Sequence, residues 1–425
     1  MPTHFDSIRS ELDSNSKFVT LAGSPYYEDA VYPKYSEGEY KRRYQLLRDY
    51  MRRNNLDAII VSGGPNHWSA CYGMGWLTNH TREWHGLANY LVVSADPNQE
   101  PTLVYSMGGT HIEATRRAAS IRDVRSSKNG RYYEVIADRL GELGLSDKRV
   151  GISMIDPRFG DYMPVNQFEG LKKRLPKAEF VFLPDVFHEL WCVKSEEEIS
   201  VMRRAGEICD AALEAIRAKA TPGVREYELR AEAAYAMHKQ DADFNFIIIG
   251  STPMSDPKQV FGNPRPSGRE LKRGDLILNE IAVEYRGMQV QIGSPICVGR
   301  PTERVEKFWN EVAKPGYEYL EKALAPGVTL DEISRMGRWY REHGSQSRPI
   351  LLHGLGVSSE RPDCSLDRVI AEDYERTLKP GMTVMLEPNA ITLDGNLGLF
   401  IGRSYVITNS GHEALTRTPI ELLIA

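Results

Sequence analysis

Residues 274–297 read GDLILNEIAVEYRGMQVQIGSPIC, and this segment gives the clearest indication of the fold of the second half of the chain. Two apolar runs flank a Tyr-Arg-Gly turn at 285–287, a pattern that predicts a β-hairpin. Because side chains alternate between the faces of a strand, Glu280 and Glu284 share one face, and Gln291 lies on the strand that follows the turn. Such a polar face is either solvated or the floor of a polar site, and the pattern alone leaves both interpretations open.

The segments around this hairpin combine helices with returning strands. Ser195 precedes Glu198 by three residues, which is the pattern of a capping box and predicts the start of an amphipathic helix. Further helices are predicted at 227–239, 303–325 and 329–343, and strands at 244–250, 276–283, 289–297, 383–388 and 400–408. Residues 191–425 are therefore predicted to form an α+β domain.

The first half of the chain alternates strands with helices. A helix is predicted at 39–54, and a buried strand at 56–62 follows it. Because this alternation continues to about residue 190, residues 39–190 are predicted to form an α/β domain. Residues 1–38 are polar and aromatic without a clear period, and we expect them to form an N-terminal arm.

The composition excludes several classes of protein. The 425 residues include 53 Lys+Arg and 58 Asp+Glu, a net charge of −5, which argues against a nucleic-acid binder with a basic face. No run approaches the roughly 18 apolar residues of a membrane span, and the first 13 residues contain no apolar signal segment. The five cysteines are widely separated and predict reduced thiols. We therefore expect a cytoplasmic protein without a membrane or nucleic-acid partner.

Five short motifs occur in the second half of the chain, and their order and spacing are informative. They are Lys-Ser at 194–195, Gly-Asp-Leu at 274–276, His-Gly-Leu-Gly at 353–356, Pro-Gly-Met at 380–382 and Leu-Glu-Pro at 386–388. In order and spacing they resemble the superfamily of prolidase, methionine aminopeptidase and creatinase. The resemblance implies two domains, an N-terminal α/β domain of the creatinase type and a C-terminal α+β "pita-bread" domain. It also implies a homodimer with a shared active site.

The resemblance locates a metal site whose ligands have changed. Metallopeptidases of the superfamily hold two metal ions with two Asp, one His and two Glu. The matching positions in this chain are Glu280, Gln291, His353, Glu387 and Gly402. Because only two carboxylates and one imidazole remain, we expect no dinuclear site and no cofactor. The alternative is one divalent metal ion at Glu280, His353 and Glu387.

The resemblance also indicates substrate-binding residues. The active-site His of creatinase corresponds to Asn263, and the second His of the prolidase pattern corresponds to Glu360. A dimethylsulfoniopropionate lyase of the superfamily also has Glu at the latter position, which leaves a lyase activity open. Together with Gln291 and Arg403, which follows Gly402, these residues are expected to bind substrate.

The N-terminal domain contains a candidate lid. In creatinase the corresponding stretch supplies an aromatic residue and an Arg to the substrate of the neighbouring subunit. Here we expect Trp76, Arg82 and His85 to serve this purpose. The alternative is that these aromatic residues belong to the core of their own domain.

The leading hypothesis is a metal-independent, creatinase-like hydrolase or lyase that acts on a small polar substrate with a C–N bond. In it His353 is the general acid and base, while Glu387 and Glu280 orient it or polarise the substrate. One alternative is a dipeptidase of the Xaa-Pro type with a reduced metal site. Another is a catalytically silent binding protein with the same fold.

Overall fold

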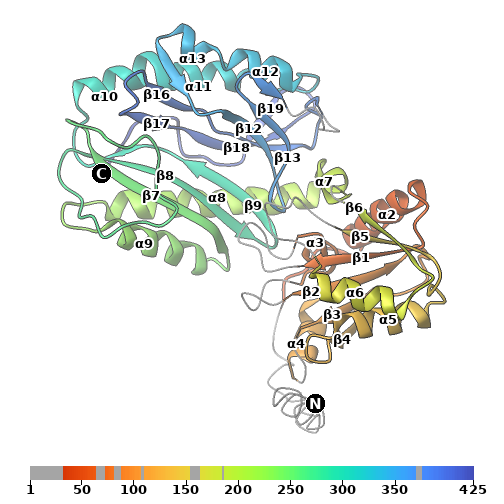
Figure 1. The fold of residues 1–425 in the computed structure, drawn as a ribbon. Helices are drawn as coiled ribbons and strands as arrows, with labels where there is room; N and C mark the ends of the chain where they lie inside the picture. The colour runs from red at the N-terminus through yellow and green to blue at the C-terminus, as the bar shows by residue number, and fades with distance from the viewer. Residues whose placement is uncertain are drawn as a thin grey trace. The chain divides into compact units, whose positions relative to one another are not determined.

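The computed structural model describes residues 32–63, 72–80, 88–106, 110–153, 163–183, 186–369 and 376–425. The chain divides into two compact units, residues 1–190 and 191–425. Figure 1 shows a mixed α/β fold in each unit. Among the described helices, none combines the length and the apolar character that a membrane crossing requires.

The N-terminal unit is built on a six-stranded sheet with the strand order β4-β3-β2-β1-β5-β6. The strands are β1 (Ala58–Gly63), β2 (Asn89–Ser94), β3 (Thr102–Tyr105), β4 (Asp123–Ser126), β5 (Arg149–Ser153) and β6 (Glu179–Leu183). The helices are α2 (Glu37–Arg53), α3 (Tyr72–Thr78), α4 (Thr110–Ala118), α5 (Tyr132–Glu142), α6 (Val165–Arg174) and α7 (Val186–Trp191). The pairs β1–β5, β5–β6 and β3–β4 are parallel, so the sheet is mixed and of the predicted α/β class.

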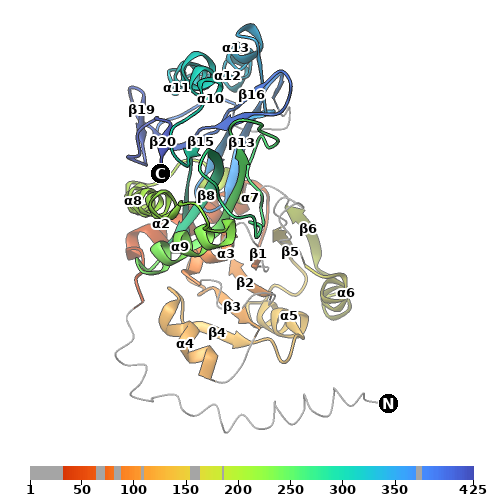
Figure 2. The ribbon, with the colours of Figure 1, turned by 90° about the vertical axis from the view of Figure 1, so that its left-hand side faces the viewer.

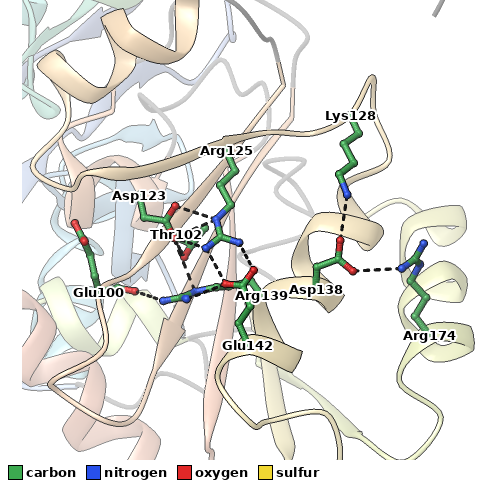
Figure 3. Close-up of polar contacts among 9 residues, drawn as sticks. All are labelled: Glu100, Thr102, Asp123, Arg125, Lys128, Asp138, Arg139, Glu142 and Arg174. Carbon is green, nitrogen blue, oxygen red and sulfur yellow. Dashed lines mark hydrogen bonds and ion pairs between the residues drawn. The ribbon is translucent and has the colours of Figure 1, made fainter. Parts of the chain in front are cut away.

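Polar contacts on this unit join β4 to the helices beside it (Figure 3). Arg125 lies 2.9 Å from Asp123 and 2.8 Å from Glu142 of α5, and Arg174 of α6 lies 3.4 Å from Asp138 of α5. The hydrogen bond from Arg125 lowers the pKa of Glu142 to about 2. Because these side chains are partly exposed, each ion pair stabilises the fold by at most about 1 kcal/mol, and the network is a structural contact.

The C-terminal unit contains an 11-stranded sheet and a 3-stranded sheet. The larger sheet has the order β14-β13-β12-β15-β18-β9-β8-β10-β20, with β7 paired to β8 and β19 to β18, and the smaller has the order β11-β16-β17. Its strands are β7 (Asp243–Pro253), β8 (Asp275–Tyr285), β9 (Met288–Gly293), β10 (Ile296–Cys297), β11 (Ser345–Ser347), β12 (Ile350–Leu355), β13 (Ser359–Ser365), β14 (Arg368–Val369), β15 (Thr383–Leu386), β16 (Asn389–Thr392), β17 (Gly398–Phe400), β18 (Gly402–Ile407), β19 (His412–Ala414) and β20 (Leu423–Ile424).

Helices cover this sheet. They are α8 (Glu196–Lys219), α9 (Glu226–His238), α10 (Glu303–Phe308), the π-helical turn η4 (Trp309–Ala313), α11 (Lys314–Glu321), α12 (Leu330–Met336) and α13 (Trp339–Glu342). The predicted capping box of Ser195 and Glu198 starts α8, with a hydrogen bond of 3.1 Å between Glu198 N and Ser195 Oγ. Helices α8 and α9 pack on β7, β8 and β9, and α10 to α13 form a second helical layer (Figures 1 and 2).

The hairpin at 274–297 forms as predicted, and its register fixes which residues of its two strands lie side by side at the site. Ile281 pairs with Ile292, and Ile277 pairs with Ile296 in the same register. The predicted second strand is nevertheless divided into β9 and β10, because Pro295 between them has no N–H to donate.

Two predicted helices are also interrupted. The predicted helix 303–325 becomes α10, η4 and α11, with the widened turn just before Pro315. A proline in a helix interior removes one backbone hydrogen bond and crowds the preceding turn. The predicted helix 329–343 divides into α12 and α13 at Gly337, where a Cβ would lie 2.4 Å from Leu351.

Candidate functional site

One face of the large sheet collects the candidate catalytic residues from distant parts of the sequence. His353 of β12 pairs with Met385 of β15, which pairs with Ser404 of β18. Two residues before Ser404, Gly402 pairs with Gly293 of β9. Because side chains alternate along strands, these positions share one face of the sheet.

The same face extends over the hairpin. Gln291 pairs with Ala282, and Glu280 lies two residues from Ala282 on β8. Glu387 directly follows β15, where its N–H donates to Leu351 O at 2.8 Å and continues the strand pairing. Glu280, Gln291 and Glu387 therefore face the same space as His353.

Glu280 and Glu387 form a buried carboxyl pair. Each side chain is buried, and Glu280 donates a hydrogen bond to Glu387. Burial, followed by the charge of Glu387, raises the pKa of Glu280 to about 8. Burial likewise raises the pKa of Glu387 to about 7, and the charge of Arg348 opposes both shifts. Ionisation of both groups at once is therefore disfavoured.

His353 lies beside this pair in a defined tautomer. Its Nδ1 is 2.7 Å from the carbonyl oxygen of Gly354, and a carbonyl accepts only, so Nδ1 carries the proton. Its Nε2, 3.7 Å from Glu387 Oε1, therefore presents a lone pair to the site. This is the form of imidazole that either accepts a proton or binds a metal ion.

Gln291 adds an acceptor to the same face. It is buried, and its Nε2 lies 3.5 Å from Ser359 Oγ. Its Oε1 has no hydrogen-bond partner within the described part of the chain. A buried amide oxygen without a donor costs free energy, and a ligand that donates to it or binds it would remove this cost.

At Gly402 the site is closed by apolar atoms. A Cβ at this position would lie 2.4 Å from Met385 Cε and 3.0 Å from the ring of Phe400. The same ring lies 2.3 Å from the place of a Cβ on Gly293. The space that a carboxylate at 402 would need is therefore filled by Met385 and Phe400.

Two predicted substrate-binding residues have other partners. Glu360 Oε2 lies 2.5 Å from Lys194 Nζ, its Oε1 accepts from Val357 N at 2.6 Å, and both charged side chains are fully buried. The Lys194 ammonium also donates to Trp191 O at 2.6 Å. Burial raises the pKa of Glu360, and the charge of Lys194 opposes this shift.

Arg403 alternates with Gly402 and therefore faces the opposite side of the sheet. Its guanidinium makes five hydrogen bonds, whose acceptors are Gly293 O, Gly402 O, Ser294 Oγ, Thr418 O and Pro419 O. Arg403 thus ties the C-terminal segment to the sheet. We leave Arg403 and Glu360 out of the proposed site, because their polar atoms are used in the fold.

Asn263 lies at the edge of the site. Its backbone exchanges hydrogen bonds of 3.1 and 3.2 Å with Ile249 of β7. Its Nδ2 lies 3.1 Å from the place of a Cβ on Gly250, which pairs with Leu278, two residues before Glu280. Asn263 is half-buried and remains a candidate hydrogen-bond donor.

The predicted lid falls mostly outside the described residues. Arg82 and His85 are not among them. Trp76 of α3 is buried in the core of its own unit, with its ring 6.3 Å from that of Phe187 and its carbonyl oxygen accepting from Arg43 at 2.6 Å. These contacts favour the alternative that Trp76 belongs to the core of its own domain.

Sequence reasoning missed Arg348. Its guanidinium carbon lies 4.1 Å from the centre of the Phe261 ring, and its charge acts on both Glu280 and Glu387. The only signal in the sequence is a charged residue shortly before the apolar run that leads to His353. No motif marks it, because its place depends on the pairing of Arg348 N with Asn389 O at 3.2 Å.

Comparisons with known proteins agree with this geometry. Residues 200–409 match Metallopeptidase family M24, and residues 43–191 match the Creatinase/Prolidase N-terminal domain. The Xaa-Pro dipeptidase of Pyrococcus horikoshii is 26% identical over 388 residues, which cover 88% of this chain and 97% of the relative. A creatinase of Bacillus sp. is 25% identical over 410 residues, 92% of this chain and 93% of that protein.

Solved structures show the same fold. The Xaa-Pro dipeptidase from Bacillus anthracis has a TM-score of 0.71 at 22% identity and covers 91% of this chain and 100% of its own. The X-Pro aminopeptidase from Thermotoga maritima has a TM-score of 0.74 at 20% identity, with 90% and 99% covered. The chain belongs to the prolidase and creatinase superfamily of hydrolases and has its two-domain pita-bread architecture, as the motifs predicted.

The family corrects one prediction. The expectation of a protein without a cofactor is wrong, because the matching family is a metallopeptidase family whose relatives include Xaa-Pro dipeptidases. The same findings favour the alternative of a dipeptidase-type metallohydrolase over a metal-independent, creatinase-like enzyme. The changes to Gln291 and Gly402 lower the number of metal ligands, but they leave Glu280, His353 and Glu387 in place.

The donors of this site fit one divalent ion. Glu280 and Glu387 offer two carboxylates, His353 offers the lone pair of Nε2, and Gln291 Oε1 is an unused neutral acceptor. At Gly402 no donor side chain exists and apolar atoms fill the space. No group of three or more potential ligands among the described residues already surrounds a common point, so the fit rests on donor chemistry.

Proposed function

We propose that this protein is a metal-dependent hydrolase of the Xaa-Pro dipeptidase type, with a reduced metal site that holds a divalent ion at Glu280, His353 and Glu387. The observation that carries the proposal is that three strands bring these side chains to one buried face at the ligand positions of the family. The sequence similarity to Xaa-Pro dipeptidases over nearly the whole chain supports a small substrate with a peptide-type C–N bond.

When bound, the ion would polarise the substrate carbonyl and activate water for attack. The residues of the chain then have separate tasks. Glu387 lies between His353 and Glu280, and its carboxylate takes the proton of the attacking water and returns it to the departing nitrogen. Water adds its oxygen to the carbonyl carbon, the C–N bond breaks, and an acid and an amine leave.

Other residues orient and shield the substrate. His353 is held by the hydrogen bond from Nδ1 to Gly354 O, which keeps Nε2 aimed at the site. Gln291 Oε1 can accept a hydrogen bond from the substrate, and the Asn263 amide can donate one. Met385 and Phe400 keep water away from the end of the site at Gly402.

The test combines metal analysis with a substrate screen. We expect purified protein reconstituted with Mn²⁺, Co²⁺ or Zn²⁺ to bind about one equivalent, to hydrolyse Xaa-Pro dipeptides and to lose activity with a chelator. The matched control for Glu387→Gln is Glu306→Gln, an exposed carboxylate on α10, which should retain both metal and activity. Undiminished hydrolysis in the presence of a chelator, with no bound metal, would refute the proposal.

The homodimer with a shared active site and the cytoplasmic location remain predictions from the sequence. We propose the dimer as the active form of this hydrolase. Sedimentation at micromolar concentration, together with activity measured on dilution, tests it, and full activity in a monomer would contradict it.

A further inference from the structure

A second pocket lies in the outer helical layer of the C-terminal unit, among α11, α12 and α13 (Figures 1 and 2). It has a volume of about 510 Å³, a size suited to a small molecule. Leu352 belongs to the core cluster that includes Leu320 of α11 and Ile333 of α12, whereas its neighbour His353 faces the other side of the sheet. The sheet therefore separates this pocket from the candidate active site.

One wall of the pocket is aromatic. The Trp339 ring stacks on the His343 ring, with centroids 3.8 Å apart and planes 13° apart, and the Tyr319 ring lies 6.5 Å from it at 30°. The indole lies close to α11 because residue 316 is glycine, where a Cβ would be only 2.6 Å from Trp339 Cζ3. Tyr319 and Trp339 line the pocket, and the Tyr319 side chain is 41% exposed. A planar ligand would gain stacking on these rings in addition to the burial of its apolar surface.

Apolar side chains extend this wall. Ala323, Val328 and Met336 line the pocket, and Val328 and Met336 also pack against the core cluster beneath the helices. Because these residues are fixed by the core, the apolar part of the pocket is formed before any ligand binds. The apolar surface therefore suits the body of a ligand, and the polar side chains around it would decide which ligand is recognised.

Charged side chains of both signs complete the lining. Lys322 and Arg335 are cations, Glu332 and Glu342 are carboxylates, and all four side chains are exposed. Glu332 Oε2 accepts hydrogen bonds from Thr329 N at 2.8 Å and Thr329 Oγ1 at 2.9 Å, and so it caps α12. Within the described part of the chain, the other three side chains make no hydrogen bond or ion pair. Two cations and one carboxylate are therefore available to a ligand.

We propose that this pocket is a second binding site and that its ligand is a free aromatic α-amino acid. The ring stacks on Trp339, the carboxylate contacts Lys322 and Arg335, and the ammonium contacts Glu342. Because the two cations and two carboxylates of the lining balance, a ligand with a net charge is attracted by one set and repelled by the other, whereas a zwitterion satisfies both. The inference does not depend on the metal centre or on the proposed function.

The first test is calorimetry of wild-type protein with L-tryptophan and three compounds that each lack one of its groups. Indole-3-propionate lacks the ammonium, tryptamine lacks the carboxylate, and L-leucine lacks the ring. We expect L-tryptophan to bind with a Kd of at most about 1 mM, and each of the other compounds to bind at least roughly fivefold more weakly. Failure of L-tryptophan to bind at about 10 mM, or equal binding of all four compounds, would refute the proposal.

The second test assigns the ligand groups with variants of exposed residues. The double change Lys322→Met with Arg335→Met should weaken L-tryptophan and indole-3-propionate roughly fivefold and leave tryptamine unaffected. Glu342→Gln should weaken L-tryptophan and tryptamine and leave indole-3-propionate unaffected. The charge control is Arg304→Met, which removes an exposed arginine of α10 paired with Asp394 and should bind all compounds as wild type does. Equal weakening of indole-3-propionate and tryptamine by either pocket variant would overturn the assignment.

The aromatic wall and the location are tested separately. Tyr319→Leu and Trp339→Leu should both weaken L-tryptophan, and the control Tyr235→Leu, which removes a tyrosine of α9 that is 63% exposed, should not. Glu387→Gln alters the candidate active site and should bind L-tryptophan as wild type does. Binding that Glu387→Gln abolishes and the pocket variants leave intact would place the ligand in the active site and refute the second site. Binding that follows the pocket variants supports it, whether or not Xaa-Pro dipeptides are hydrolysed.

Discussion

Two buried ionisable pairs lie in the C-terminal unit, and they differ in how their charges are balanced. Lys194 and Glu360 pair opposite charges at 2.5 Å, and backbone groups complete their hydrogen bonds. Glu280 and Glu387 pair two like groups, and burial raises the pKa of both, with the charge of Glu387 adding to the shift of Glu280. In the first pair each charge offsets the burial of the other, whereas the like groups of the second pair would be offset by a bound cation.

The largest effect should follow from Glu387→Gln. We expect kcat to fall on the order of a thousandfold, because the variant loses a metal ligand and the group that moves the proton. The free energy of unfolding of the metal-free protein should not fall. A carboxyl whose pKa rises on folding, here from 4.5 to about 7, costs stability as the pH increases through that window, and glutamine does not ionise.

Steady-state kinetics and urea unfolding at pH 5 and pH 8 check this prediction. The difference in stability between Glu387→Gln and wild type should favour the variant more at pH 8. If Glu387→Gln were less stable than wild type by several kcal/mol at both pH values, the expected difference between the Glu280–Glu387 pair and the Lys194–Glu360 pair would be contradicted.

Lys194→Met should show the opposite behaviour. Removing one partner leaves Glu360 buried and unpaired, which costs about 3–5 kcal/mol of unfolding free energy. The double change Lys194→Met with Glu360→Leu should recover most of this loss. At a temperature where the variant is folded, kcat should stay within a few-fold of wild type.

The control is Arg203→Met, which breaks the exposed pair with Glu413 and should cost less than about 1 kcal/mol. Urea unfolding measures all three changes. A folded Lys194→Met variant without catalytic activity would show that the Lys194–Glu360 pair takes part in catalysis. That result would contradict its expected structural role.

The smallest effect should come from Gly402→Ala, which tests the apolar end of the site. The added Cβ would press on Met385 Cε and the Phe400 ring, and we expect a loss of about 1–3 kcal/mol. Adding Met385→Ala should recover part of it. Gly411→Ala, where no atom lies within 4 Å of the added Cβ, is the control, and equal effects in thermal unfolding would show that packing at Gly402 is loose.

Some local predictions held because their causes are local. The capping box at Ser195 and the hairpin around residues 285–287 both formed, since each depends on neighbours a few residues away. The long helix expected at 303–325 failed at its middle, where Pro315 alters the turn before it. A pattern of apolar residues could not show this interruption, because the apolar spacing continues through it.

Predictions of contact fared differently. Glu360 was expected at the site because it corresponds to the second His of the prolidase pattern, and Arg403 because it follows Gly402. The alternation of β18 turns Arg403 to the opposite face, and Lys194 engages Glu360. Arg348, which no motif marks, lies beside the carboxyl pair.

Short motifs in the sequence were enough to identify the superfamily and the order of its two domains, and the resemblance gave the positions of Glu280, His353 and Glu387. The three-dimensional fold was needed to show that these side chains share one buried face, that Met385 and Phe400 fill the space at Gly402, and that Arg348 lies over the ring of Phe261. The reason is physical: these contacts depend on the register between strands far apart in the chain, where a shift of one residue turns every side chain to the other face.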